Sequence, residues 1–89
     1  MRIYVEFVWS VAEKVGMRYL WLNLDYEELK LEDILKNTPL YYRRRSGAII
    51  YKLILERELL VIVNDVISDL TIKLKDGDKI LIQPLASGG

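Results

Sequence analysis

The chain has 89 residues, 52% of them hydrophobic and 29% charged, which is enough for one small core but not for a large enzyme cleft. Thirteen basic residues balance thirteen acidic ones, so no net field would attract a nucleic acid or an anionic membrane. Cysteine and histidine are absent, which excludes disulfides, thiolate nucleophiles and the commonest metal ligand. The longest wholly apolar run, residues 59–63, is too short to span a bilayer, and the N-terminus lacks a signal-peptide pattern. A cytoplasmic protein without a membrane segment is therefore expected.

The first part of the chain predicts a strand, a short helix and a second strand. Residues 2–8 and 17–25 each place apolar side chains at alternate positions, which is typical of strands. Between them, Ser10–Glu13 has the S-x-x-E spacing of a helix-capping box, and Gly16 is a plausible helix stop. A helix of little more than one turn is therefore predicted over Val11–Val15.

The middle of the chain predicts a second helix. Three apolar residues recur there at helical spacing: Leu31, Ile34 and Leu35. Glu32 and Asp33 favour a helix N-terminus, and Pro39 ends the helix because the residue before a proline is pushed out of the α region. The following stretch, Tyr41–Leu55, fits either a helix with an exposed arginine face or an irregular connection that ends in a strand.

The last third of the chain predicts two further strands. Leu59–Val63 is unbroken and rich in β-branched residues, which favours a strand buried on both faces. Asp76-Gly77-Asp78 predicts an exposed turn whose charges are neutralised by the flanking lysines. Lys79–Gln83 is the last predicted strand, and Pro84 stops it. Strands at both ends and a helix between them predict an α+β fold, with the helix packed on one face of a mixed sheet.

The segment after the last strand is expected to be a short tail. It ends in Ala86-Ser87-Gly88-Gly89, and residues without a Cβ atom can enter a narrow channel and let a partner approach the backbone. Leu85 is apolar and is expected to anchor in a partner's groove. The sequence is thus divided into a domain over residues 1–83 and a tail over residues 84–89, which reaches at most about 20 Å when extended.

Residues 63–89 resemble the C-terminal half of the small, ubiquitin-like sulfur-carrier proteins, above all the small subunit of molybdopterin synthase. The likeness is carried by Val63-Asn64, Thr71, Leu74, Asp76-Gly77-Asp78, Pro84 and Gly88-Gly89. The N-terminal half agrees more loosely, and residues 40–58 depart from the pattern. The resemblance implies a β-grasp (ubiquitin-like) fold, with a mixed sheet, a helix packed on one face and a flexible C-terminal diglycine tail.

The resemblance also implies a chemistry for the tail. A partner related to ubiquitin-activating enzymes uses ATP to adenylate Gly89, and a sulfur donor converts the adenylate to a thiocarboxylate. The large subunit of molybdopterin synthase then receives the tail in a hetero-oligomer, and sulfur passes to a pterin precursor during molybdenum cofactor biosynthesis. In this scheme Gly88, Ser87 and Ala86 thread into the pocket, while Leu85 and Pro84 contact the partner. The chain alone is expected to be no enzyme and to bind no cofactor or metal.

Other functions remain open at the level of the sequence. The chain could carry sulfur for thiamine or tRNA thiolation, be conjugated to lysines as a ubiquitin-like modifier, or be a non-catalytic β-grasp interaction module. Tyr41–Arg45 combines aromatic and basic residues, as nucleic-acid sites do, but the zero net charge favours a solvated face. Trp9 and Trp21 are expected to pack in the core or at its rim rather than to bind a ligand.

Overall fold

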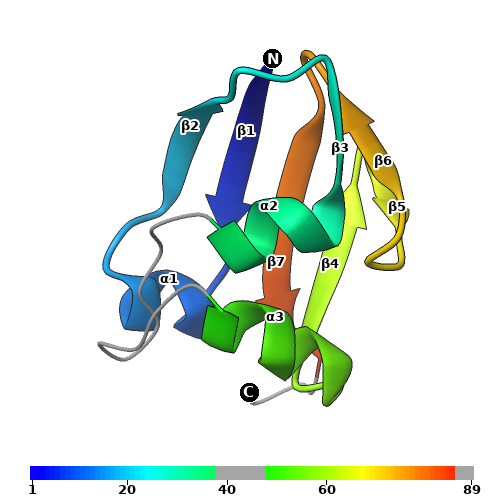
Figure 1. The fold of residues 1–89 in the computed structure, drawn as a ribbon. Helices are drawn as coiled ribbons and strands as arrows, with labels where there is room; N and C mark the ends of the chain where they lie inside the picture. The colour runs from blue at the N-terminus through cyan, green and yellow to red at the C-terminus, as the bar shows by residue number, and fades with distance from the viewer. Residues whose placement is uncertain (38–47, 86–89) are drawn as a thin grey trace.

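A computed structural model of the chain describes residues 1–37 and 48–85. The elements of these residues, in chain order, are β1 (Arg2–Phe7), α1 (Ser10–Val15), β2 (Tyr19–Asn23), β3 (Glu28–Lys30), α2 (Leu31–Asn37), α3 (Ala48–Leu55), β4 (Leu59–Val63), β5 (Val66–Ile67), β6 (Lys73–Lys75) and β7 (Lys79–Pro84) (Figure 1). All four predicted strands are present, those at residues 2–8, 17–25, 59–63 and 79–83. The helix predicted from Leu31, Ile34 and Leu35 is also present, as α2.

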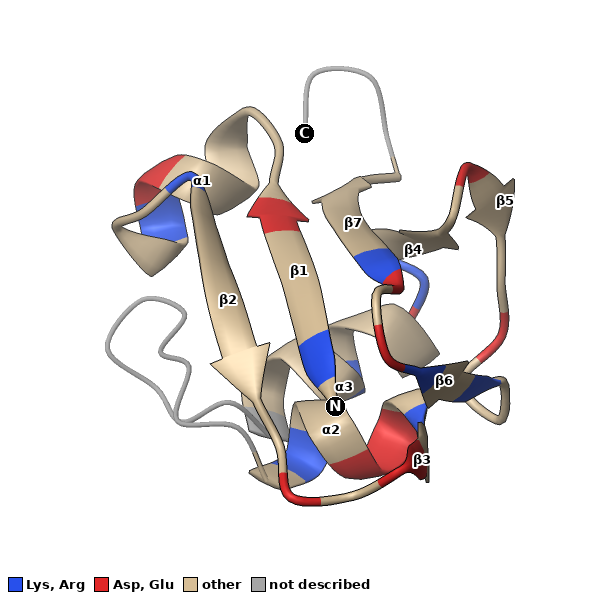
Figure 2. Cartoon of the chain, turned by 90° about the horizontal axis from the view of Figure 1, so that it is seen from above, with Lys and Arg blue, Asp and Glu red and all other residues tan. Residues whose placement is uncertain are grey.

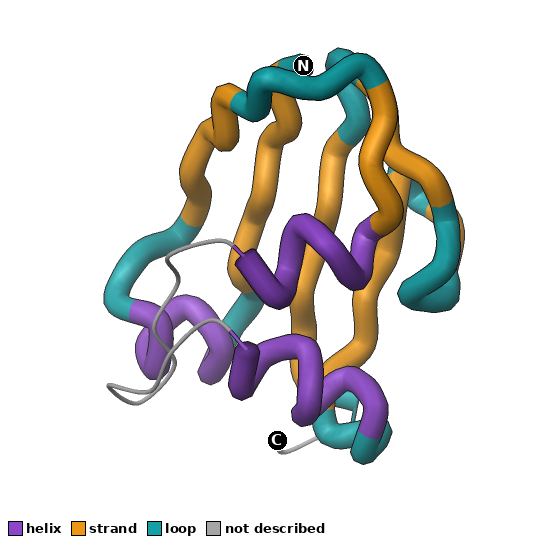
Figure 3. The backbone as a smooth tube through the Cα atoms, viewed as in Figure 1, coloured by secondary structure: helices purple, strands orange, loops and turns teal. Residues whose placement is uncertain are grey.

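The main sheet has five strands in the order β2-β1-β7-β4-β5. β1 and β7 run parallel and every other neighbouring pair is antiparallel, so the predicted mixed sheet is confirmed. β3 and β6 form a separate two-stranded sheet. Helices α2 and α3 lie across the same face of the main sheet (Figures 1 and 3). We call the opposite face the outer face.

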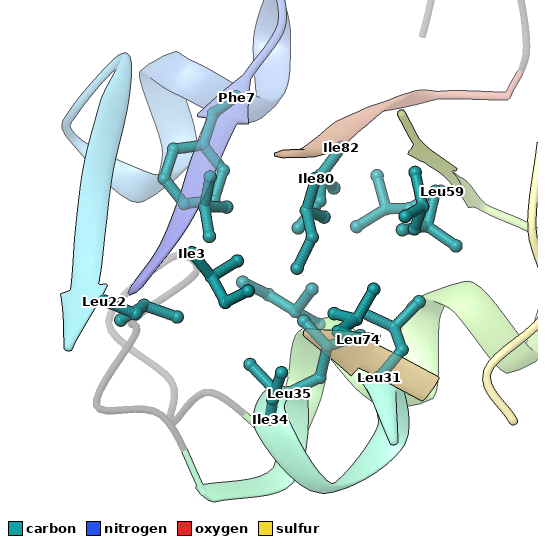
Figure 4. Close-up of a cluster of buried hydrophobic side chains, with 14 of the residues drawn as sticks. Ile3, Phe7, Leu22, Leu31, Ile34, Leu35, Leu59, Leu74, Ile80 and Ile82 are labelled. Carbon is teal, nitrogen blue, oxygen red and sulfur yellow. The ribbon is translucent and has the colours of Figure 1, made fainter. Parts of the chain in front are cut away.

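The core lies between the main sheet and the helices (Figure 4). Alternate residues of the three central strands point into it, as the period of two along a strand requires. These residues are Ile3, Val5, Phe7, Leu59, Val61, Val63, Ile80 and Ile82, and all are buried. Leu31, Ile34 and Leu35 of α2 cover them, so the three apolar positions predicted for this helix all belong to the core.

The start of α1 differs from the prediction. Helix α1 begins at Ser10, its N-cap is Trp9, and no side chain caps it, so the expected capping box is absent. The capping box would need Ser10 as the N-cap, but the N-cap lies one residue earlier, at Trp9, whose backbone has a φ of 51°. The predicted stop is confirmed, because Gly16 adopts the left-handed conformation with φ 88° and its N–H bonds to the carbonyl of Ala12.

Strand β4 was predicted to be buried on both faces, and this is wrong. Leu59, Val61 and Val63 are buried against the helices, whereas Leu60 and Ile62 on the outer face are only partly buried. Of the two alternatives for residues 41–55, the described part is a helix, α3. Residues 38–47, which include the basic cluster Tyr41–Arg45, lie outside the described residues.

The Asp76-Gly77-Asp78 segment is a turn, as predicted, but it is not wholly exposed. Gly77 has a φ of 89°, which a residue with a Cβ rarely adopts. Asp78 is only 9% exposed, and its carboxylate accepts hydrogen bonds from the Asn64 side-chain amide and the Lys75 backbone N–H, both at 2.9 Å. The Asp78 carboxylate therefore joins the turn to the residue that follows β4. The sequence had predicted an exposed carboxylate with no structural role at this position.

The two tryptophans lie outside the core. Trp9 is 72% exposed. Trp21 is 46% exposed and packs at the rim, with its ring 4.9 Å from that of Tyr4 and the Arg2 guanidinium 4.2 Å above it. Within the described ranges, no helix combines the length and apolar character that crossing a membrane would need.

Candidate functional site

The predicted site begins where β7 ends, and its described part consists of Pro84 and Leu85. Ala86, Ser87, Gly88 and Gly89, for which threading and activation were predicted, lie outside the described residues. β7 is the middle strand of the main sheet, held by β1 on one side and β4 on the other. Any segment that follows Leu85 is thus attached to the best-supported strand of the fold.

Pro84 belongs to the sheet, whereas the sequence predicted it to stop the strand. It is buried and is the last residue of β7, opposite Leu59 of β4. The Leu85 N–H donates to the Glu58 carbonyl, so Leu85 and Glu58 form a hydrogen-bonded pair of the antiparallel ladder. Hydrogen-bonded and non-hydrogen-bonded pairs alternate along such a ladder, so the backbone nitrogen of Pro84 points away from β4 and toward the β1 side. On that side, the pairing of β1 with β7 ends at Ile82. The lack of an N–H on Pro84 therefore costs the sheet no hydrogen bond between strands.

Leu85 is tied to the folded body more closely than a free tail would be. Its N–H donates to the Glu58 carbonyl at 3.3 Å, and its side chain is 48% exposed. The side chain lines a groove of about 480 Å³ that also includes Leu55 of α3, Leu60 of β4 and Leu70. The sequence did not indicate this groove, because its walls come from segments that are far apart in the chain.

The outer face carries an apolar patch next to β7. The strand registers place five residues in one row across the sheet: Tyr19, Glu6, Leu81, Ile62 and Ile67. We define the outer patch as Leu60, Ile62, Ile67 and Leu81. Its β4 and β7 members are partly buried, and Ile67 is 68% exposed. Patches of this kind, on the same strands that lead to the tail, are typical of surfaces that meet other proteins.

Two titratable groups in the described part of the chain have shifted pKa values: Tyr4, beside the start of β7, and Asp69, which lines the groove at Leu85. Burial, followed by a hydrogen bond to Glu6, raises the pKa of the Tyr4 hydroxyl above its ordinary value. A hydrogen bond from the Thr71 hydroxyl lowers the pKa of the exposed Asp69 carboxyl. Over residues 1–37 and 48–85, no three His, Cys, Asp or Glu side chains are grouped as metal ligands.

No protein-family model and no curated protein matches the sequence. The structure, in contrast, matches solved structures over almost its whole length. SAMP1 of Haloferax volcanii is 18% identical with a TM-score of 0.68, and the match covers 100% of both chains. The fold is the ubiquitin-like β-grasp.

Two further solved structures share this fold. A protein assigned as molybdopterin converting factor subunit 1 from Pyrococcus furiosus is 15% identical, with a TM-score of 0.69 over 96% of this chain and 98% of that one. In a complex of subunits 1 and 2 of molybdopterin-converting factor from Helicobacter pylori, the matching chain is 21% identical, with a TM-score of 0.58 and full coverage of both. The resemblance drawn from residues 63–89 is thus matched by a similarity of fold.

Proposed function

We propose that this protein is a sulfur carrier that acts as the small subunit of molybdopterin synthase, with Gly89 as the residue that carries sulfur. The observation that carries the proposal is the attachment of Gly88-Gly89, through only three residues, to the central strand of a β-grasp sheet. The similarity of fold to molybdopterin converting factor subunit 1 supports it.

The chemistry requires partners, because a carboxylate is a poor electrophile. A free α-carboxyl has a pKa near 3.5 and is ionised at neutral pH. In the proposed reaction, the Gly89 carboxylate attacks the α-phosphorus of ATP on an adenylating enzyme, and pyrophosphate leaves. A sulfide-equivalent donor then attacks the carbonyl carbon and AMP leaves, which gives the thiocarboxylate. The absence of cysteine is compatible with this scheme, because sulfur is carried on the terminal carbon.

The folded body has the role of docking. The outer patch and Leu85 lie on or next to β4 and β7, and together they offer an apolar surface beside the exit of the tail. Such a surface suits the large subunit of molybdopterin synthase, which would bind the body while the tail enters its active site. A few side chains that are fully desolvated near the centre of an interface supply most of its binding energy.

A second candidate is a protein modifier, because one structure of the same fold is named small archaeal modifier protein 1. Carrier and modifier would use the same activated Gly89, and they differ only in the nucleophile, which is a sulfur donor in one case and a lysine amine in the other. The geometry of β7 and Leu85 suits both.

The intact mass of the protein, purified from its own host, tests the proposal. Replacement of one carboxyl oxygen by sulfur at Gly89 is the expected result for a carrier. A branched peptide that joins Gly89 to a lysine of another protein would support the modifier instead. A chain that continues beyond Gly89 in the cell, or a Gly89 carboxylate that stays unmodified when molybdenum cofactor is being made, would contradict the carrier.

A further inference from the structure

The exposed edge of β2 is a second surface that the proposed function does not use. β2 is the terminal strand of the main sheet, and among residues 1–37 and 48–85 it pairs only with β1. β1 separates it from β7, so it lies apart from the exit of the tail (Figure 1). An edge strand presents main-chain donors and acceptors that another strand can pair with.

The register shows which main-chain groups face outward. The Phe7 N–H donates to the Arg18 carbonyl at 2.7 Å, and the Leu24 N–H donates to the Met1 carbonyl at 2.8 Å. Hydrogen-bonded and non-hydrogen-bonded pairs alternate along an antiparallel ladder, so these two bonds determine the type of every β1–β2 pair between them. The three residues whose N–H and C=O groups point away from β1 are Tyr19, Trp21 and Asn23.

A largely apolar groove runs beside this edge, between β2 and α2. Its volume is about 370 Å³. Leu22 of β2 and Leu24, which directly follows β2, form one side of the groove. Ile34 of α2 forms the other side, and Tyr26 lines the groove from the connection that follows β2. A strand added to β2 would direct every second side chain toward this groove, because side chains alternate between the faces of a sheet.

The rim of the groove is acidic. Asp33 of α2 lines it, and Asp25 and Glu27 flank Tyr26. Figure 2 shows acidic residues along the connection from β2 to β3 and at the start of α2. The ion pairs between described residues, Lys52–Glu56 and Lys73–Glu28, do not involve these three carboxylates. Asp25 lines a neighbouring pocket together with Met1 and Arg2, so the two carboxylates available to a bound cation at this groove are those of Glu27 and Asp33.

We infer that the β2 edge binds an extended, basic segment of another protein by adding it to the main sheet. Main-chain bonds to Tyr19, Trp21 and Asn23 hold the segment, apolar side chains at alternate positions enter the groove, and a lysine or arginine meets the carboxylates at the rim. Strand addition of this kind takes its affinity from main-chain bonds and its specificity from the pockets for alternate side chains. The inference is independent of sulfur transfer.

Two synthetic peptides of about seven residues test the inference, one alternating valine with lysine and one alternating valine with glutamate. Titration of the full chain, followed by amide NMR, should shift the Tyr19, Trp21 and Asn23 resonances with the lysine peptide. Its dissociation constant should be at least about tenfold lower than that of the glutamate peptide, and it should rise with salt.

Charge variants sharpen the test. The double variant Glu27→Gln, Asp33→Asn should weaken binding of the lysine peptide by about fivefold, since exposed ion pairs contribute modestly. Glu56→Gln is the matched control: Glu56 is an exposed glutamate beyond the end of α3, outside the groove, and its loss should leave the affinity unchanged.

Three outcomes would overturn the inference. The first is that shifts appear at the outer patch and not on β2. The second is that the three amides change with protein concentration alone, which would make a second copy of the chain the occupant. The third is that the Trp21 amide is protected from exchange in the free protein and does not respond to the peptide, which would mean that the edge is already covered.

Discussion

Substitution of Leu85 by alanine tests the end of β7 both as a structural element and as a docking element. Complete burial of a leucine side chain is worth roughly 1.5–3 kcal/mol. Leu85 is 48% exposed, so about half of this, roughly 1 kcal/mol, already stabilises the isolated fold through the groove. We expect Leu85→Ala to lower the melting temperature by about 5 °C, as a loss of this size does in a domain of similar length.

The exposed half of the side chain is what remains for a partner. Its burial against the large subunit would contribute about another 1 kcal/mol, so the dissociation constant of Leu85→Ala should rise about fivefold. Calorimetric titration against the large subunit measures the affinity, and a melting curve measures the stability. Leu24→Ala is the control, because Leu24 is also partly buried in the fold but follows β2 at the opposite end of the sheet from the last residues of β7.

The two measurements refute different parts of the reasoning. An unchanged melting temperature would mean that Leu85 does not occupy its groove in solution. An unchanged affinity, with Leu24→Ala also unchanged, would place the docking surface elsewhere on the molecule. A loss of affinity as large in Leu24→Ala as in Leu85→Ala would show that binding follows stability and not contact.

Three further variants have definite expected outcomes. Deletion of Gly89 should abolish ATP–pyrophosphate exchange on the adenylating enzyme and leave the melting temperature unchanged; exchange by the truncated chain would refute the role of Gly89. Gly88→Val should slow sulfur transfer sharply while docking survives, because a β-branched side chain widens the tail, and equal transfer rates would exclude a narrow channel. Thr71→Val should raise the pKa of Asp69 toward its ordinary value in an NMR titration, because the hydroxyl bond that lowers it is lost. In the wild type, the bond from the Thr71 hydroxyl to Asp69 stabilises the folded state at pH values above the pKa that Asp69 has in the unfolded chain. This stabilisation is lost as the pH falls through the lower pKa of Asp69 in the folded state.

The sequence predicts the large elements of this fold because their patterns are local. The alternation around Ile3, Val5 and Phe7 and the helical spacing of Leu31, Ile34 and Leu35 each suffice to identify an element and its buried face. The short strands β3, β5 and β6 were not predicted, because two or three residues carry no period and depend on partners far along the chain.

The sequence singles out Pro84, Leu85 and the two terminal glycines, of which only Pro84 and Leu85 lie within the described residues. The glycine pair is visible in the sequence, whereas the groove at Leu85 is assembled from α3, β4 and Leu70 and has no local pattern. The position of Pro84 inside β7 was missed for a related reason. A proline can remain in a strand if no neighbouring strand needs a hydrogen bond from its nitrogen. At Pro84 this holds because the pairing with β1 has already ended at Ile82, which the local sequence does not show.

The parallel pairing of β1 with β7 has a consequence for biosynthesis. Strand β1 acquires its neighbour β7 only after residues 79–84 have been synthesised, so the main sheet cannot close before that point. A chain that ended before residue 79 would lack β7, would leave the β1–β2 and β4–β5 pairs without the strand that joins them, and would expose the core to cellular proteases. The main sheet therefore closes only in a chain that has been synthesised at least through residue 84.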